Sequence, residues 1–469
     1  MNPRLLVWLL LAAGLVSPAA ETERNAWPFR VDMVNEDTGD TVTRQAAGPF
    51  YSWQKDAAGD TVEAFRPFVL TTHDGKSEAT YFLYPLFTWK SEPGYHHFSF
   101  FNLANDNREA PEAGRPGVHG FDVWPFYFSR ETGQPETSYH AFFPVAGTIK
   151  QRFGKDRLTW YLFPLYFNTD KAGKQITSAP WPFVRIINGA GHHGFELWPL
   201  FGSRGREGDY RSQFYLWPFG YKVEANLSAP QPDVSLGALP FYARASGPGY
   251  VSESYAWPFF GYTRRTEPAK YDERRYFWPF LLQGRGEDHY INRWAPVYTH
   301  SVIKGYDKTW VLWPLYRNAR WKEDGVAQEK TQLLWVLYSS LEQHSLTNPA
   351  AAPARKEHLW PLYSAWDNGA GRRQFQLLSP LEPFFPHNDV VRRLYTPLFA
   401  VYRMDQRAPG DTSHSILWNL VSWRCSPARQ EFHFTVLGWR REAGAARGSF
   451  FLFDFHPKKD SKSKEPATP

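Results

Sequence analysis

A short apolar signature recurs along the chain and alternates with polar, glycine-containing stretches. The signature is an aromatic residue, then Pro, then Phe or Leu, and it returns about every nineteen residues. Stretches with turn composition, such as residues 35–40, 73–76 and 204–209, stand between successive signatures. The pattern predicts one strand of about twelve residues per repeat, with the signature at its centre. The repeat is carried most clearly by Trp27 and Pro28, Tyr84 and Pro85, Trp124 and Pro125, Phe163 and Pro164, Trp198 and Pro199, Trp217 and Pro218, Trp257 and Pro258, Trp278 and Pro279, Trp313 and Pro314, and Trp360 and Pro361.

One turn per strand makes successive strands antiparallel neighbours, so the repeat predicts an all-β meander of about 22 to 24 strands. Parallel coils of a β-solenoid have a similar period, but turns rich in Asp-Gly and Gly-Asp favour hairpins. In residues 309–317, Trp313 and Pro314 point to opposite faces of the predicted strand, and both are apolar. Strand centres are therefore expected to face an apolar environment on both sides, unlike those of an ordinary half-solvated sheet.

Two architectures accommodate such strands. The one we favour is a large outer-membrane β-barrel, whose transmembrane strands need about 9 to 11 residues and whose interfaces are rich in aromatic residues. The alternative is a soluble sheet that bends at the Pro rows and rolls or folds into packed layers. Proline favours the alternative, because it cannot donate to the strand ladder and a closed barrel has no edge strand to accept it.

Composition excludes two other classes of protein. Aromatic residues make up 18% of the 469 residues, which is too many for a disordered chain. The mean hydropathy is -0.52, and beyond the first twenty residues no apolar run is long enough for a membrane-spanning helix. The 38 Pro and 34 Gly residues spread along the chain also argue against helical bundles.

The sequence predicts three consecutive parts. Residues 1–20 have a positive end, an apolar core and small residues before Ala20, which is typical of a cleaved signal peptide. Residues 21–455 are expected to form a single β-repeat domain, and residues 456–469 a basic disordered tail. Cys425 is the only cysteine, so no intramolecular disulfide is expected, as is common in bacterial envelope proteins.

No sequence motif indicates a reaction, a metal site or a cofactor, so we expect a protein that is not an enzyme. The adjacent histidines at positions 96–97 and 192–193 would point to opposite faces of a strand, which disfavours a shared metal. Arginine pairs recur at strand ends, as at positions 264–265 and 392–393. They are interpreted as a solvated rim or as contacts for lipopolysaccharide phosphates.

These observations predict a non-enzymatic, exported cell-envelope protein. In the favoured hypothesis it is an outer-membrane β-barrel with a structural or passage role, in contact with membrane lipid or lipopolysaccharide. In the alternative it is a β-repeat scaffold or binding protein of the periplasm or cell surface, with an unidentified ligand or protein partner. Nucleic acid is not an expected partner, because an exported protein rarely meets it.

Overall fold

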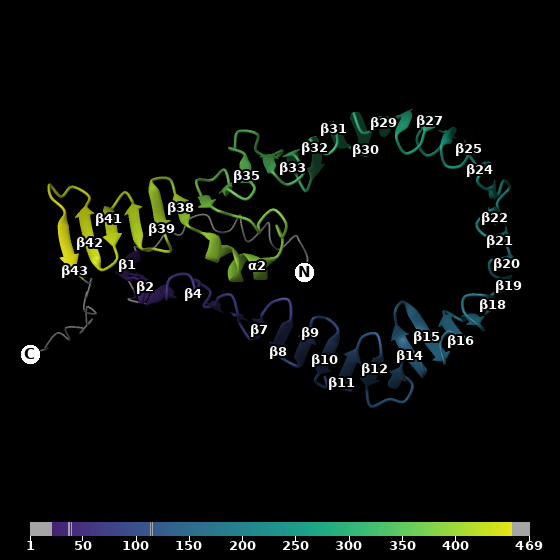
Figure 1. Cartoon of the computed structure of the whole chain (residues 1–469), viewed down its shortest axis with the longest axis horizontal. Coiled ribbons are helices and arrows are strands. Elements are labelled where there is room, and N and C mark those ends of the chain that lie inside the picture. The colour runs from purple at the N-terminus through teal and green to yellow at the C-terminus, as the bar shows by residue number, and fades with distance from the viewer. Residues whose placement is uncertain (1–20, 36–37, 39, 113, 115, 453–469) are drawn as a thin grey trace, which may run out of the picture. The chain divides into compact units, whose positions relative to one another are not determined.

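The computed structural model describes residues 21–35, 38, 40–112, 114 and 116–452. The signal peptide expected at residues 1–20 and the tail expected at residues 456–469 lie outside this described part. The fold is all-β, as predicted, and consists of one antiparallel meander sheet of 43 strands (Figure 1). Within the described residues, β1 pairs with β2 and β43 pairs with β42, so hydrogen bonds do not close the sheet into the barrel that we favoured.

The described chain packs as two compact units. Unit 1 combines the residues up to Tyr84 with those from Trp360 onward, and unit 2 comprises Pro85–Leu359. The strands of unit 1 are β1 Glu21–Ala26, β2 Arg30–Asn35, β3 Thr41–Ala46, β4 Tyr51–Lys55, β5 Thr61–Phe65, β6 Val69–Asp74, β7 Ser77–Phe82, β36 Tyr363–Asp367, β37 Arg373–Leu377, β38 Tyr402–Ala408, β39 Asp411–Ile416, β40 Val421–Cys425, β41 Arg429–Phe434, β42 Leu437–Glu442 and β43 Ser449–Leu452. Helix α2 Asp389–Leu394 and the 3-10 helix η1 Thr396–Phe399 lie between β37 and β38.

Unit 2 is an uninterrupted series of strands. They are β8 Phe87–Glu92, β9 Tyr95–Phe100, β10 Ala104–Glu109, β11 Val118–Val123, β12 Tyr127–Glu131, β13 Tyr139–Phe142, β14 Ala146–Arg152, β15 Lys155–Tyr161, β16 Tyr166–Lys171, β17 Lys174–Ser178, β18 Val184–Gly189, β19 His192–Leu197, β20 Phe201–Arg206, β21 Tyr210–Tyr215, β22 Gly220–Ala225, β23 Asp233–Ala238, β24 Tyr242–Gly247, β25 Tyr250–Tyr255, β26 Phe260–Arg265, β27 Tyr271–Phe277, β28 Leu281–Gly286, β29 His289–Trp294, β30 Tyr298–Ile303, β31 Tyr306–Val311, β32 Tyr316–Glu323, β33 Val326–Leu333, β34 Tyr338–Ser345 and β35 Ala354–Leu359.

The predicted strand count and strand length are wrong, because the chain reverses twice in each repeat. The signature lies in a turn, as at residues 216–219 between β21 and β22, and not at a strand centre. Each repeat is therefore a hairpin of two short strands. Strands have 4 to 8 residues, fewer than the twelve or so expected. A six-residue strand spans about 20 Å.

The predicted apolar strand centres are also not observed. Polar residues pair across neighbouring strands, with hydroxyl oxygens 3.0 Å apart between Thr148 and Thr159 and 2.8 Å apart between Ser252 and Thr263. The apolar residues that were assigned to strand centres lie in the turns instead. Because the signature lies in turns, many strand centres are polar, and the sheet has little continuous apolar core.

Unit 1 is held together by contacts between the two ends of the chain. Leu394 of α2 is fully buried against Ala64 and Leu70, which belong to β5 and β6. Tyr395 Oη donates a hydrogen bond of 2.7 Å to the carbonyl oxygen of Tyr84. Strands β5 and β6 thus pack on the α2 region through side chains and not through a strand ladder.

The two faces of the unit 2 sheet differ in burial. Cross-strand register places Arg185, Arg275, Ala319 and Arg317 on one face, which we call the Arg317 face, and Tyr316 on the other, the Tyr316 face. The Arg317 face carries several of the most buried side chains of the unit, among them Trp160, Ile187, Leu282 and Ala319. No helix among the described residues is long and apolar enough to cross a bilayer.

Candidate functional site: the apolar edge of the sheet

The signature turns of each unit lie along one edge of the sheet. Each of them connects an odd-numbered strand to the following even-numbered strand, whereas the polar turns connect even-numbered strands to odd-numbered ones. In a meander of hairpins, alternate turns fall at opposite edges. We call the edge with the signature turns the apolar edge and the other the polar edge. All the Pro residues of the predicted repeat, with the aromatic residues before them, lie in turns.

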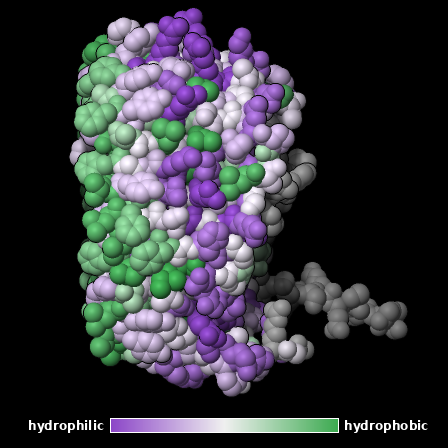
Figure 2. All heavy atoms as spheres, turned by 90° about the vertical axis from the view of Figure 1, so that its right-hand side faces the viewer, coloured by the Kyte–Doolittle hydropathy of each residue, from purple (hydrophilic) through white to green (hydrophobic). Residues whose placement is uncertain are grey.

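Large apolar side chains are exposed along the apolar edge. Phe241 is 78% exposed, Leu165 60% and Trp217 52%, values that are unusual for side chains of this size. Figure 2 shows hydrophobic residues gathered along one side of the molecule and hydrophilic residues over the rest of that face. Other exposed members in unit 2 are Trp124, Phe126, Leu200, Phe219, Trp257, Phe280, Trp313 and Leu315, and in unit 1 Phe29 and Phe50.

The backbone N–H groups of three signature turns are all bonded within the sheet. In the turn 216–219, the N–H groups of Leu216 and Trp217 donate to carbonyl oxygens of the preceding signature turn, at 2.6 and 2.7 Å. Phe219 N donates to the carbonyl oxygen of Leu216 at 2.8 Å, and Pro218 has no N–H. The turn therefore exposes apolar side chains without exposing an unsatisfied donor. The turns at residues 162–165 and 312–315 have the same three hydrogen bonds.

This bonding explains why proline is placed where it is. In this turn Leu216, Trp217 and Phe219 donate to carbonyl oxygens, and Pro218 occupies the remaining position, where no donor is needed; the Trp217–Pro218 peptide bond is cis. In an apolar medium each unsatisfied backbone donor is costly, so a proline here makes the edge compatible with burial away from water.

A row of tyrosines borders the apolar edge on the Tyr316 face. Tyr166, Tyr242 and Tyr316 each stand directly after a signature turn, as the first residue of a strand. Their rings pack across strands, with a centroid distance of 5.6 Å both from Tyr166 to Tyr161 and from Tyr242 to Tyr255. From the edge inward the order is Trp, Phe and Leu, then Tyr, then charged and hydroxyl side chains. This order is typical of side chains at a membrane interface.

The polar edge has the opposite character. Its turns contain Gly in the left-handed region, such as Gly208 with a φ of +69°, next to charged residues. In that turn Arg206 and Asp209 form an exposed ion pair of 3.6 Å. Apolar residues at this edge do not form a row; Leu346 and Phe153 are exposed examples, and the Phe153 ring also contacts Phe128, with 6.1 Å between the ring centroids.

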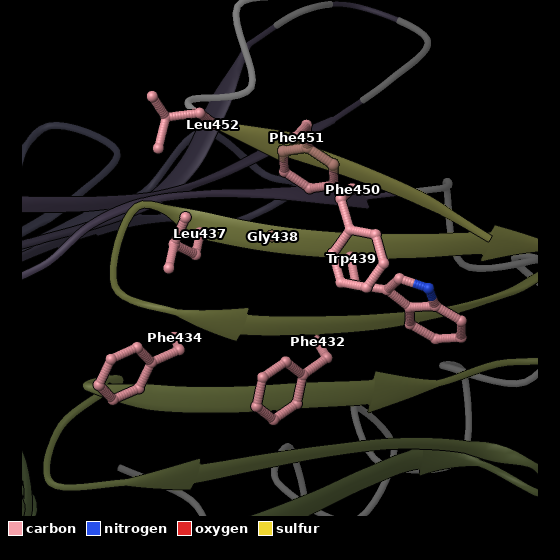
Figure 3. A pocket seen from close by; sticks show the side chains of 8 residues that line it. All are labelled: Phe432, Phe434, Leu437, Gly438, Trp439, Phe450, Phe451 and Leu452. Carbon is pink, nitrogen blue, oxygen red and sulfur yellow. The ribbon is translucent and has the colours of Figure 1, made fainter.

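An apolar hollow adjoins the apolar edge near the end of unit 1. Its volume is about 450 Å³, and Figure 3 shows side chains from the last three strands around it. Phe434 and Leu437 flank a signature-type turn, so the hollow extends the apolar edge onto one face of these strands. The lining residues are Phe432, Phe434, Leu437, Gly438, Trp439, Phe450, Phe451 and Leu452.

The histidine pairs considered for metal binding lie in strands β9 and β19 and contact polar neighbours. His97 Nδ1 lies 2.5 Å from Asn107 Oδ1, and His192 Nδ1 lies 3.4 Å from Tyr210 Oη. Over the described residues, no group of three or more His, Cys, Asp or Glu side chains is placed to hold a metal ion.

Sequence reasoning identified the apolar residues of the signature but missed their gathering at one edge. The signal for it was present, since each period contains both a Pro signature and a Gly-rich stretch, and both are turns. Comparison of the sequence with protein-family models and with curated proteins finds no match.

Proposed function

We propose that this chain is a non-enzymatic cell-envelope protein that rests on a lipid bilayer by its apolar edge and acts there as a scaffold. The observation that supports it most is the apolar edge itself, a row of exposed Trp, Phe and Leu side chains on turns such as 162–165, 216–219 and 312–315, whose backbone N–H groups are bonded within the sheet. A soluble monomer rarely exposes apolar residues in such a continuous arrangement.

The dimensions agree with shallow insertion. Interfacial protein segments bury their apolar side chains about 5 to 10 Å into a bilayer. A signature turn with the first strand residue covers a comparable depth, since a strand rises about 3.3 Å per residue. Full burial of one Phe, Leu or Met side chain contributes about 1.5 to 3 kcal/mol, so a few turns suffice for stable binding.

The outer-membrane barrel with a passage role receives less support than it did from the sequence. Strands of 4 to 8 residues are shorter than the 9 to 11 or so that a transmembrane strand needs. A soluble envelope scaffold without membrane contact is the remaining alternative, and it leaves the apolar edge without a role. Export rests on the predicted signal peptide.

Flotation with vesicles tests the proposal. The chain from residue 21 onward is mixed with neutral phosphatidylcholine vesicles, so that attraction between charges does not contribute. We expect the protein to float with the vesicles. A double variant at the apolar edge, Phe219→Ser with Phe241→Ser, is expected to bind at least tenfold more weakly, which corresponds to about 1.4 kcal/mol.

A matched control removes apolar side chains at the polar edge. Phe153 and Leu346 are exposed there, and the double variant Phe153→Ser with Leu346→Ser is expected to float like the unmodified chain. Failure of the unmodified chain to float, or equal loss in both double variants, would contradict the proposal.

A further inference from the structure

Four cationic side chains gather on the Arg317 face of strands β29 to β33. They are Arg293, Lys308, Arg317 and Lys330, which we call the basic cluster. Lys308 and Lys330 are the two cross-strand partners of Ala319, so the three residues form one row perpendicular to the strands. Arg317 lies two residues from Ala319 on the same strand and hence on the same face.

Three carboxylates of these strands lie on the opposite face, and Glu323, at the polar-edge end of β32, shares the Arg317 face. Asp307, Glu329 and Glu342 lie on the Tyr316 face by the same register. There they are neutralised locally, since Glu329 Oε1 lies 2.8 Å from Arg320 Nη2 and Glu342 Oε1 lies 3.3 Å from Arg355 Nε. Among the described residues, neither Lys308 nor Lys330 has a carboxylate within 4.0 Å of its amine.

The centre of the basic cluster is occupied by a small, covered side chain. Ala319 is 1% exposed and has only a methyl side chain, whereas the lysines on either side of it are long. Their Cα atoms are two strand spacings apart, about 10 Å, and both side chains are long enough to extend toward an anion placed between them. Arg317 precedes Ala319 by two residues in β32 and flanks it on the same face.

Arg317 is held in place by groups that leave its charge uncompensated. Its guanidinium contacts Gln332 Oε1 at 3.1 Å and Tyr306 Oη at 3.3 Å, and lies 5.1 Å from the centroid of the Trp310 ring. Its Nε is buried and has no hydrogen-bond partner among the described residues. A fixed guanidinium with a spare donor is suited to an anion.

The electrostatics of the lysines agree with this geometry. Burial lowers the pKa of Lys308, and repulsion from Arg317 and Arg293 lowers it further. Burial and repulsion from Arg317 and Lys356 likewise lower the pKa of Lys330. An anion between the two amines would offset this repulsion.

Two other cations on the same face are paired with carboxylates of the chain itself. Arg185 Nη1 lies 2.9 Å from Glu196 Oε2, and Arg275 Nη1 lies 3.0 Å from Glu273 Oε1. The basic cluster differs from these pairs, because among the described residues no carboxylate lies within 4.0 Å of the amines of Lys308 and Lys330.

We infer that the basic cluster is a binding site for a phosphate-bearing anion, seated over Ala319 between Lys308 and Lys330 with Arg317 at its side. Two ammonium groups and a planar guanidinium are the donors that proteins use for phosphate. The source is either a lipid headgroup or a soluble phosphate. Arg317 stands two residues after the signature turn at 312–315, and the lysine row two residues further, so the lysine row lies about 13 Å from the apolar edge. This inference does not depend on the proposed bilayer docking.

Binding measurements on the chain from residue 21 onward test the site. Titration calorimetry with inorganic pyrophosphate probes a soluble phosphate, and flotation with vesicles containing phosphatidylglycerol probes a lipid headgroup. We expect the double variant Lys308→Gln with Lys330→Gln to weaken binding of at least one probe by tenfold or more. The matched control, Arg320→Gln with Lys322→Gln, removes two positive charges from the opposite face of the same region and is expected to bind like the unmodified chain.

Each outcome has a defined meaning. Loss confined to pyrophosphate binding identifies a soluble phosphate as the source, and loss confined to phosphatidylglycerol vesicles identifies a lipid headgroup. Equal weakening in both double variants would show general charge attraction and overturn the inference, as would the absence of binding to either probe. Neutral vesicles report on the apolar edge alone, so failure of the edge and failure of the basic cluster are distinguished. Circular dichroism verifies that each variant is folded.

Discussion

Cationic side chains in two regions of the molecule differ in whether a carboxylate of the chain pairs with them. In unit 1, Arg424 forms two contacts of 2.9 Å with the carboxylate of Asp411 and donates to the carbonyl oxygen of Glu21 at 3.0 Å. Both side chains of this ion pair are about nine-tenths buried. In unit 2, Lys308 and Lys330 of the basic cluster have no such partner in the described part of the chain.

The difference follows from what covers each region. In unit 1, strand β1 from the start of the chain packs against β40 and β41, which removes Arg424 from water. A buried charge without a partner costs several kcal/mol, so pairing is required there. The lysines of unit 2 remain half-buried and partly hydrated, so they tolerate the lack of a counter-charge. In this comparison the covered Arg424 is paired with a carboxylate, whereas the half-buried Lys308 and Lys330 are not.

The largest effect is expected from breaking the buried pair of unit 1. Arg424→Ala leaves Asp411 buried without its partner and is expected to lower the free energy of unfolding by about 3 to 5 kcal/mol. Denaturant unfolding followed by circular dichroism measures this change. The control is Arg320→Ala, which breaks a pair whose side chains are 63% and 38% exposed and should cost about 0 to 1 kcal/mol. Similar losses of unfolding free energy in both variants would show that burial of an ion pair does not determine its contribution to stability.

A second effect concerns a buried histidine beside the cations of unit 2. Burial, followed by repulsion from Lys356 and Lys330, lowers the pKa of His358 to about 4, from about 6.5 when unfolded. The unfolded chain then binds more protons than the folded chain between pH 4 and 6.5, so this contribution to stability is lost as the pH falls through that range. The loss amounts to about 3 kcal/mol at most.

Unfolding midpoints measured at several pH values check this prediction. His358→Gln cannot take up the proton, so its stability should depend less on pH between about 6.5 and 4 than that of the unmodified chain. Parallel pH dependence in both proteins would show that His358 is not buried in its neutral form.

The smallest effect has the opposite sign to that of Arg424→Ala. Lys330→Met removes a half-buried cation that is repelled by Arg317, and it is expected to leave stability unchanged or raise it by about 1 kcal/mol. Denaturant unfolding at neutral pH measures it. A loss of several kcal/mol would mean that Lys330 has a structural partner and would undermine the contrast between the two regions.

The sequence predicted the fold class but not the position of the chain reversals. The polar turns were recognisable from Gly with Asp or Lys, and they established an antiparallel meander. The signature resembles a strand because the residues around Pro218 and Pro314 are hydrophobic, and a short apolar run does not distinguish a buried strand from an apolar turn. The prolines were the contrary evidence, since a residue without an N–H fits a turn better than a ladder.

The sites could be predicted only in part, because they depend on register. The sequence identified Trp217, Pro218 and their counterparts as important. That they share one edge becomes visible only once the signature is known to be a turn, because alternate turns of a meander lie at the same edge. The basic cluster was not recognisable, since Lys308, Arg317 and Lys330 are separated along the chain and meet only through the pairing of β31, β32 and β33. The closed barrel was favoured for a related reason. With only one turn recognised in each repeat, the predicted strands were long enough to cross a membrane.

The most direct test of the central claim compares the two edges of the sheet at single positions. Cys425 is replaced by Ser, and a single cysteine is introduced either by Phe241→Cys at the apolar edge or by Asp209→Cys at the polar edge. Each is labelled with a fluorophore that is sensitive to polarity, and neutral vesicles carrying a lipid-attached quencher are added. The account predicts a blue shift and quenching for the label at position 241 and neither for the label at position 209. Equal responses at both positions, or none at position 241, would contradict it.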